Sequence, residues 1–148
     1  LGKLQTIANA PNADDYRVGA TPASAVLKLA AFGLEGEVLM AQGDVQGAIR
    51  AFQAGVAIED QNNYTEPPDW AQPMRHYLGA ALLKAAQPAA AEAVYRRDLR
   101  WNQNNGWALF GLHQALVAQG KSSEAEEIYR ECQTPWTYAD VELTASHL

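Results

Sequence analysis

A short stretch rich in proline and aromatic residues carries the side chains best suited to contact a ligand. It reads NNYTEPPDWAQPMRH and ends at His76, and its candidate contact residues are Tyr64, Glu66, Trp70, Arg75 and His76. Paired prolines restrict the backbone, so Glu66 and Trp70 could meet a ligand with little entropy left to lose. The stretch therefore predicts a rigid lip at the mouth of a binding site. The alternative is a structural plug, in which Tyr64 and Trp70 cover an apolar gap and Glu66 pairs with Arg75.

The remaining reactive side chains give little sign of enzyme chemistry. His76, His113 and His147 lack the spacing of metal ligands. Cys132 is the single cysteine, which excludes an intrachain disulfide, a zinc ribbon or a redox pair. The sequence contains no phosphate-binding loop, nucleophile elbow or dinucleotide fingerprint. We therefore expect no enzyme activity, metal or cofactor, and keep as a minor alternative a ligand or metal site where Glu66 and His76 meet at the lip.

Composition and charge limit the classes of molecule that the chain could bind. The 148 residues carry a formal net charge of −6, which disfavours nucleic acid and anionic lipid. Three arginines, Arg96, Arg97 and Arg100, offer too small a phosphate footprint, and we expect a solvated face or charge complementarity with another subunit. No apolar run approaches the length of a membrane span. A single thiol is compatible with the cytoplasm. Because the chain begins with Leu1, we expect a fragment whose upstream domains are missing.

Three segments of the chain share one pattern of small and aromatic residues. Each has an alanine followed four positions later by an aromatic residue: Ala48 and Phe52, Ala91 and Tyr95, Ala125 and Tyr129. Residues four apart share a helix face, so the alanine lets two backbones approach while the ring fills the space to the next helix. The last two pairs are 34 residues apart, and the first two are 43 apart because nine residues are inserted near 63–71.

A unit of two short helices cannot bury its apolar face alone, so such units must stack. A 34-residue period with this pattern resembles the tetratricopeptide repeat (TPR) family over about Leu29 to Ala139. The small residue of the first helix in that family falls on Gly36 and Gly79, whereas the third copy has His113. The stretch from Ile58 to Leu83 also resembles the C-terminal part of bacterial TPR proteins without a settled activity. The resemblance implies an all-α superhelix, an α-α solenoid of about three hairpins, and a bacterial origin.

The predicted organisation has three parts. Residues 1–20 form a loop or the remnant of an upstream segment, residues 21–139 form the repeat domain, and residues 140–148 form a C-terminal cap or tail. The repeats span about 29–62, 72–105 and 106–139, with the proline-rich insertion at about 63–71. We expect no strand, and a short capping helix after Trp136 to cover the last apolar face.

Local signals predict the helix boundaries. Hairpin turns are expected at Gly43, Gln87 and Gly120. Helix N-caps are expected at Thr21, at Asp69 and at Ser123, the last as a capping box with Glu126. We also expect the three repeated alanines to be buried, and their aromatic partners to pack between neighbouring hairpins.

In the TPR family the first helices of the repeats line a concave groove. The resemblance therefore implies a groove for a partner at Glu37, Met40, His76, Lys84, Trp107, Phe110 and Gln114. An apolar and aromatic floor with a few polar groups is typical of a peptide or small-ligand site. Trp107 and Phe110 would supply apolar contact, and Arg75, His76 and Lys84 would donate hydrogen bonds.

These features predict a non-catalytic protein–protein interaction module that binds a peptide or partner segment in its groove. The alternative is a structural end-piece that self-associates, as in a homodimer, or docks to the rest of a longer bacterial repeat protein. The two can be told apart by what occupies the groove, because a groove filled by the chain's own residues would favour the structural role.

Overall fold

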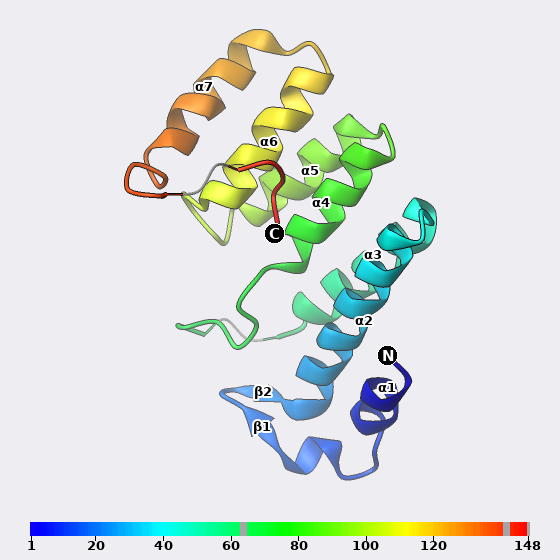
Figure 1. Cartoon of the computed structure of the whole chain (residues 1–148). Coiled ribbons are helices and arrows are strands. Elements are labelled where there is room, and N and C mark those ends of the chain that lie inside the picture. The colour runs from blue at the N-terminus through cyan, green and yellow to red at the C-terminus, as the bar shows by residue number, and fades with distance from the viewer. Residues whose placement is uncertain (63–64, 141–142, 148) are drawn as a thin grey trace. The chain divides into compact units, whose positions relative to one another are not determined.

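The computed structural model describes residues 1–62, 65–140 and 143–147, and in them seven α-helices make up nearly all of the regular structure (Figure 1). The expected all-α class is confirmed. The chain divides into two compact units, Leu1–Met74 and Arg75–Leu148, called here the first and second unit. Within the described part, no helix combines the length and the apolar character needed to cross a membrane.

The first unit is built on two long antiparallel helices. Its elements are α1 (Gly2–Ala8), the 3-10 helix η1 (Ala13–Asp15), β1 (Arg17–Val18), β2 (Thr21–Pro22), α2 (Ala23–Ala41) and α3 (Val45–Glu59). Helix α2 packs against both α1 and α3. The turn between α2 and α3 falls at Gly43, as expected, where a φ of 83° favours glycine. The Asp44 side chain then caps α3 by accepting a hydrogen bond from the Gly47 amide at 2.8 Å.

The expectation of no strand was wrong, and of the two alternatives for residues 1–20 the structure does not show the loop, whereas the remnant of an upstream segment stays a prediction. Helix α1 lies within this stretch, and β1 and β2 form a two-residue antiparallel ladder that pairs Val18 with Thr21. Gly19, at φ 55°, allows the chain to reverse between them. The ladder lies before the repeated segments in the chain, so it does not affect the prediction of helices in them.

The second unit contains the other four helices. They are α4 (Met74–Lys84), which begins at the unit boundary, α5 (Pro88–Asp98), α6 (Gly106–Ala118) and α7 (Ser122–Gln133). Helix α6 packs against α5 and α7. The expected turns at Gln87 and Gly120 are confirmed: Gln87 is the N-cap of α5, and Gly120 has a φ of 72°. The Asn105 side chain caps α6 by accepting hydrogen bonds from the amides of Trp107 and Ala108.

The three repeated alanines are buried as expected, with exposed fractions of 0% for Ala48, 0% for Ala91 and 2% for Ala125. Their aromatic partners Phe52 and Tyr95 are also buried. Tyr129 is not, because 46% of it is exposed. The expectation that Tyr129 packs between hairpins was wrong, since no helix follows α7 in the described residues; its ring lies beside His113, with centroids 5.0 Å apart.

Three expected capping features are absent from the described structure. Thr21 lies in β2, and α2 follows Pro22 without a side-chain cap. Helix α7 begins at Ser122 after Lys121, again without a side-chain cap, so Ser123 lies inside the helix. The expected C-terminal capping helix is missing because residues 134–140 and 143–147 adopt turns, bends and irregular backbone.

Candidate functional site

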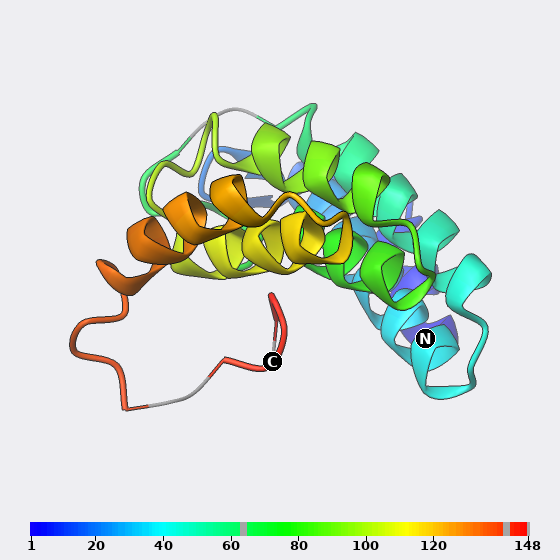
Figure 2. The same cartoon turned by 90° about the horizontal axis from the view of Figure 1, so that it is seen from above.

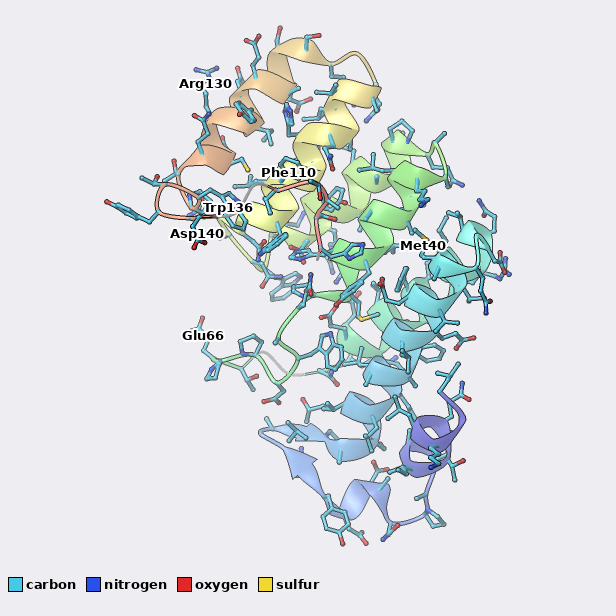
Figure 3. The ribbon with its side chains drawn as sticks, viewed as in Figure 1. Met40, Glu66, Phe110, Arg130, Trp136 and Asp140 are labelled. Atoms are coloured by element: carbon cyan, nitrogen blue, oxygen red, sulfur yellow. The ribbon has the colours of Figure 1, made fainter. Side chains whose placement is uncertain are left out.

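The predicted groove residues are divided between the two units. Glu37 and Met40 lie on α2 of the first unit, whereas His76, Lys84, Trp107, Phe110 and Gln114 lie on α4 and α6 of the second (Figure 3 labels Met40 and Phe110). The Glu37 carboxylate has one buried oxygen, Oε1, without a partner in the described residues. In the second unit, two of the predicted residues, Trp107 and Gln114, contact residues that follow α7 in the chain.

Residues from the C-terminal part of the chain contact one face of α6. Trp107, Phe110 and Gln114 share this face because they are three and seven positions apart. The Trp107 ring meets the Trp136 ring edge to face, with centroids 5.1 Å apart, and Gln114 Nε2 donates to the Thr144 carbonyl oxygen at 3.4 Å. In Figure 2 the chain leaves α7 and turns back to the helices of this unit.

On α4, the Tyr77 side chain meets the C-terminal segment (residues 143–147). Its ring stacks on His147, with centroids 4.9 Å apart and an angle of 26° between the planes. Tyr77 was not predicted as a site residue, because the resemblance assigned the groove position to its neighbour His76. One residue along a helix turns the side chain by about 100°. The face that meets the segment is therefore that of Tyr77.

His76 and Arg75 were predicted to donate hydrogen bonds into the groove, and the structure places them elsewhere. Both are buried, at 1% and 8% exposure. His76 Nε2 lies 3.0 Å from Asp98 Oδ2, and Asp98 is equally buried, so the imidazole belongs to the interior of the second unit. The Nδ1 atom of His76 has no hydrogen-bond partner among the described residues.

Ser146 is the anchor of the C-terminal segment. It is fully buried, and its hydroxyl donates to the His76 carbonyl oxygen at 2.8 Å and lies 2.7 Å from the Tyr95 hydroxyl. A carbonyl oxygen can only accept, so the single serine proton goes to His76 and the Tyr95 hydroxyl must donate to Ser146. Burial raises the pKa of Tyr95 well above its ordinary value, although the Ser146 contact acts in the opposite direction. Tyr95 therefore remains a hydrogen-bond donor.

Trp136, ten positions before Ser146, lies near the start of α6 (Figure 3). Its indole lies so close to Gly106 that an added Cβ would sit 2.2 Å from Nε1. The Cys132 thiol packs beside the same residue, 3.6 Å from the Gly106 carbonyl oxygen. Burial raises the pKa of the Cys132 thiol, which keeps it protonated. The prediction that Cys132 is a packing residue is confirmed.

The predicted lip lies between α3 and α4, and Tyr64 falls outside the described residues. Glu66 is exposed on this loop (Figure 3), and Trp70 is half-buried with Nε1 unpartnered in the described structure. The peptide bond between Glu66 and Pro67 is cis. Lys84, at the end of α4, is exposed.

Asp69 does not cap α4 as expected, but ties the lip to the β1–β2 turn within the first unit. Its Oδ2 atom accepts hydrogen bonds from the Ala20 amide at 3.1 Å, the Thr21 amide at 3.0 Å and the Thr21 hydroxyl at 2.8 Å. The amide at the start of α4, that of Met74, instead donates to Glu59 Oε2 at 3.0 Å. Asp69 therefore fastens the lip to the first unit through a contact that neither interpretation of the lip predicted.

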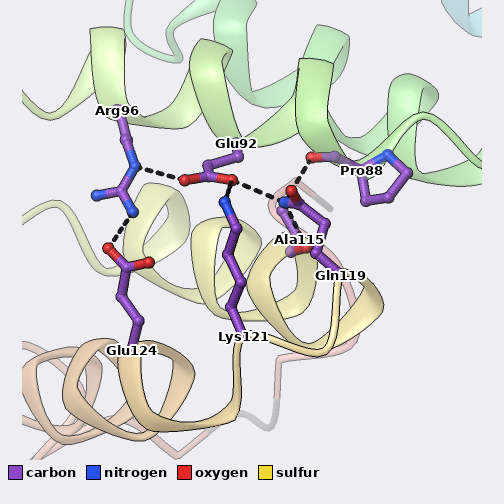
Figure 4. A network of polar contacts seen from close by, with 7 residues as sticks. All are labelled: Pro88, Glu92, Arg96, Ala115, Gln119, Lys121 and Glu124. Carbon is purple, nitrogen blue, oxygen red and sulfur yellow. Dashed lines mark hydrogen bonds and ion pairs between the residues drawn. The ribbon is translucent and has the colours of Figure 1, made fainter.

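A charged network on the second unit accounts for part of the arginine cluster (Figure 4). Glu92 accepts hydrogen bonds from Lys121 at 2.6 Å, Gln119 at 2.7 Å and Arg96 at 2.9 Å. The Lys121 bond, helped by Gln119 and Arg96, outweighs burial and lowers the pKa of Glu92 to about 2. Arg96 also pairs with Glu124 on α7, so this arginine is used within the chain.

The described residues contain no group of three or more His, Cys, Asp and Glu side chains placed to hold a metal ion. Comparison with known protein families, curated proteins and solved structures finds no match to this chain.

Proposed function

We propose that this chain is a non-catalytic interaction module of the TPR type, in which the face of α4 and α6 binds a short peptide segment. One observation carries the proposal: the C-terminal segment already lies on this face, with Ser146 fully buried and His147 stacked on Tyr77. A face that holds one non-helical segment of polypeptide has the contacts to hold another.

The internal repetition supports a TPR arrangement of the helices. Gly36 and Phe52 are 16 positions apart and in close contact, and Gly79 and Tyr95 repeat both the spacing and the contact. His113 and Tyr129 have the same spacing, with ring centroids 5.0 Å apart. A contact repeated at one spacing indicates one supersecondary unit used three times, which is the basis of a solenoid.

A peptide-library selection on the full chain tests this function. Phe110 lies between Trp107 and Gln114 on the binding face, so Phe110→Ala should weaken a selected peptide about tenfold or more. The matched control is Tyr129→Ala, which removes an exposed aromatic residue from α7. Failure to select any peptide, or equal binding by the Phe110→Ala chain, would overturn the proposal.

A second candidate is a structural end-piece whose groove serves only to dock the chain's own end. The C-terminal segment and the contact between Trp136 and Trp107 favour it, because the chain's own residues cover this face, which is the arrangement expected of a structural role. Under this reading, Trp136→Ala lowers the melting temperature and opens no new binding capacity. Under the first, Trp136→Ala strengthens the binding of peptides that reach Trp107.

A further inference from the structure

We infer that Tyr95 and the His76 carbonyl form a subsite selective for a serine hydroxyl, and that Tyr77 beside it takes a flat ring. The ligand is a peptide segment, offered by another molecule, in which serine is directly followed by histidine or an aromatic residue. The chain's own Ser146–His147 pair occupies this site and competes with that ligand. The inference rests on the proposed function and specifies the ligand of the same face.

The hydroxyl selectivity follows from the two groups that face Ser146. Tyr95 presents a donor at 2.7 Å and the His76 carbonyl presents an acceptor at 2.8 Å, so the ligand atom must accept and donate at once. A hydroxyl does both, whereas alanine does neither and leaves the buried Tyr95 hydroxyl unpaired. Sites built to bond a hydroxyl reject analogues that lack it far more strongly than apolar pockets reject a missing methylene.

The size of the subsite restricts the ligand further. Ser146 is fully buried, and Tyr95 is held between Gly79 on α4 and Gly111 on α6, where an added Cβ would lie 2.2 Å from the ring in either case. The tyrosine ring cannot retreat without striking a helix backbone. A phosphorylated serine would bring at least one negative charge and three more oxygens against Tyr95, on which the buried Asp98 carboxylate already acts electrostatically. We therefore expect phosphoserine to be excluded.

The second recognition element is the ring that follows the serine. His147 stacks on Tyr77 at a plane angle of 26°, a geometry that any flat aromatic or imidazole ring can adopt. Together the hydroxyl and the ring define a two-residue motif. Thr144, two positions before Ser146, is exposed and contributes a main-chain oxygen, which carries no side-chain information.

The chain's own segment is only partly buried on this site. Among residues 143–147 only Ser146 is buried, and the bond from Gln114 to Thr144 is long at 3.4 Å. Attachment through the short connection after α7 nevertheless gives the segment an effective concentration on the order of millimolar. A separate ligand must overcome this local excess, so the intact chain should bind it weakly until its own segment is released.

The test uses the full chain and a fluorescein-labelled peptide with the sequence of residues 139–147. Ser146→Asp releases the segment by placing a carboxylate in a buried position against the His76 carbonyl oxygen. A second release variant, Ser146→Ala with His147→Ala, guards against a folding defect, and thermal melts check both. By fluorescence anisotropy, the released chains should bind the peptide about tenfold or more tighter than the unaltered chain does.

Peptide and protein variants then test the hydroxyl. Replacing the peptide's serine by alanine should weaken binding to a released chain about tenfold to 100-fold. Tyr95→Phe in the released chain should cause a similar loss, and the alanine peptide should then lose little more. Tyr129→Phe is the matched control, because it removes the hydroxyl at the equivalent position of the next repeat. The phosphoserine peptide should not bind.

The outcomes separate this inference from the proposed function. Equal binding of the serine and alanine peptides overturns the hydroxyl subsite. Absence of peptide binding by both folded release variants overturns the inference as well. If library-selected peptides still bind and depend on Phe110, the proposed function stands without it; if they fail too, both fall.

Discussion

The ring of Phe52 lies against Gly36 so closely that an added Cβ would sit 2.2 Å from the ring. The same distance separates Tyr95 from a Cβ added to Gly79. In both hairpins a missing side chain on the first helix makes room for the aromatic residue of the second. His113 replaces the glycine in the third copy, and there the aromatic partner Tyr129 lies beside the imidazole and is exposed.

Replacing Gly36 by alanine should destabilise the first unit. Overpacking of a tight core costs about 1–3 kcal/mol, and the better helix propensity of alanine offsets up to about 1 kcal/mol of it. We expect a net loss of about 1–2 kcal/mol in the free energy of unfolding, measured by urea denaturation. Gly2→Ala is the control, because nothing lies within 4 Å of a Cβ added there. An unchanged midpoint for Gly36→Ala would contradict the packing argument.

Replacing Ala91 by leucine tests the same close approach from the alanine side of the second unit. Ala91 is fully buried, so three extra carbon atoms must displace neighbouring helices, at about 1–3 kcal/mol. Ala93→Leu, on the exposed side of the same helix, should change the midpoint by much less. Equal midpoints for the two variants would show that Ala91 is not a packing constraint.

Glu92 should make stability depend on pH in the acid range. Its pKa is lowered from 4.5 to about 2 in the folded chain, so its contribution is complete above pH 4.5 and is lost as the pH falls toward 2. Glu92→Gln should therefore lower the free energy of unfolding by about 1 kcal/mol at pH 7 and flatten its decline in acid. Glu127→Gln changes the net charge equally from an exposed position and should leave the acid dependence as it is.

Asp69→Ala should detach the lip from the β1–β2 turn. The change leaves three donors on Ala20 and Thr21 without their acceptor, and Thr21 is 2% exposed. Loss of a buried acceptor costs about 1–3 kcal/mol, and proteolysis within residues 65–73 should become faster. Asp69→Asn keeps one acceptor oxygen, so its stability and its rate of proteolysis should lie between those of the unaltered chain and Asp69→Ala. If cleavage of the lip is unaffected by either change, Asp69 does not anchor it.

Local patterns in the sequence were enough to predict the helical class, the turns at Gly43 and Gly120, and the burial of Ala48 and Ala91. These features depend on contacts within a few residues or within one hairpin, where the periodicity of a helix decides which side chains face inward. The cap predictions at Thr21 and Ser123 failed because residue types that cap helices also occur in strands and inside helices. Thr21 lies in β2, and Ser123 lies within the first turn of α7. At Asp69, hydrogen bonds to residues almost 50 positions earlier replaced the cap.

What occupies the face of α4 and α6 was decided only by the tertiary structure. The hydroxyl of Ser146 reaches a carbonyl 70 positions earlier and a tyrosine 51 positions earlier, and no spacing in the sequence marks these partners. The same packing turned His76 inward to Asp98 and left Tyr77 to meet His147. A repeat pattern determines which helices form and which residues lie between them, because those contacts recur. A contact made once, by an irregular segment, depends on the folded surface that it meets.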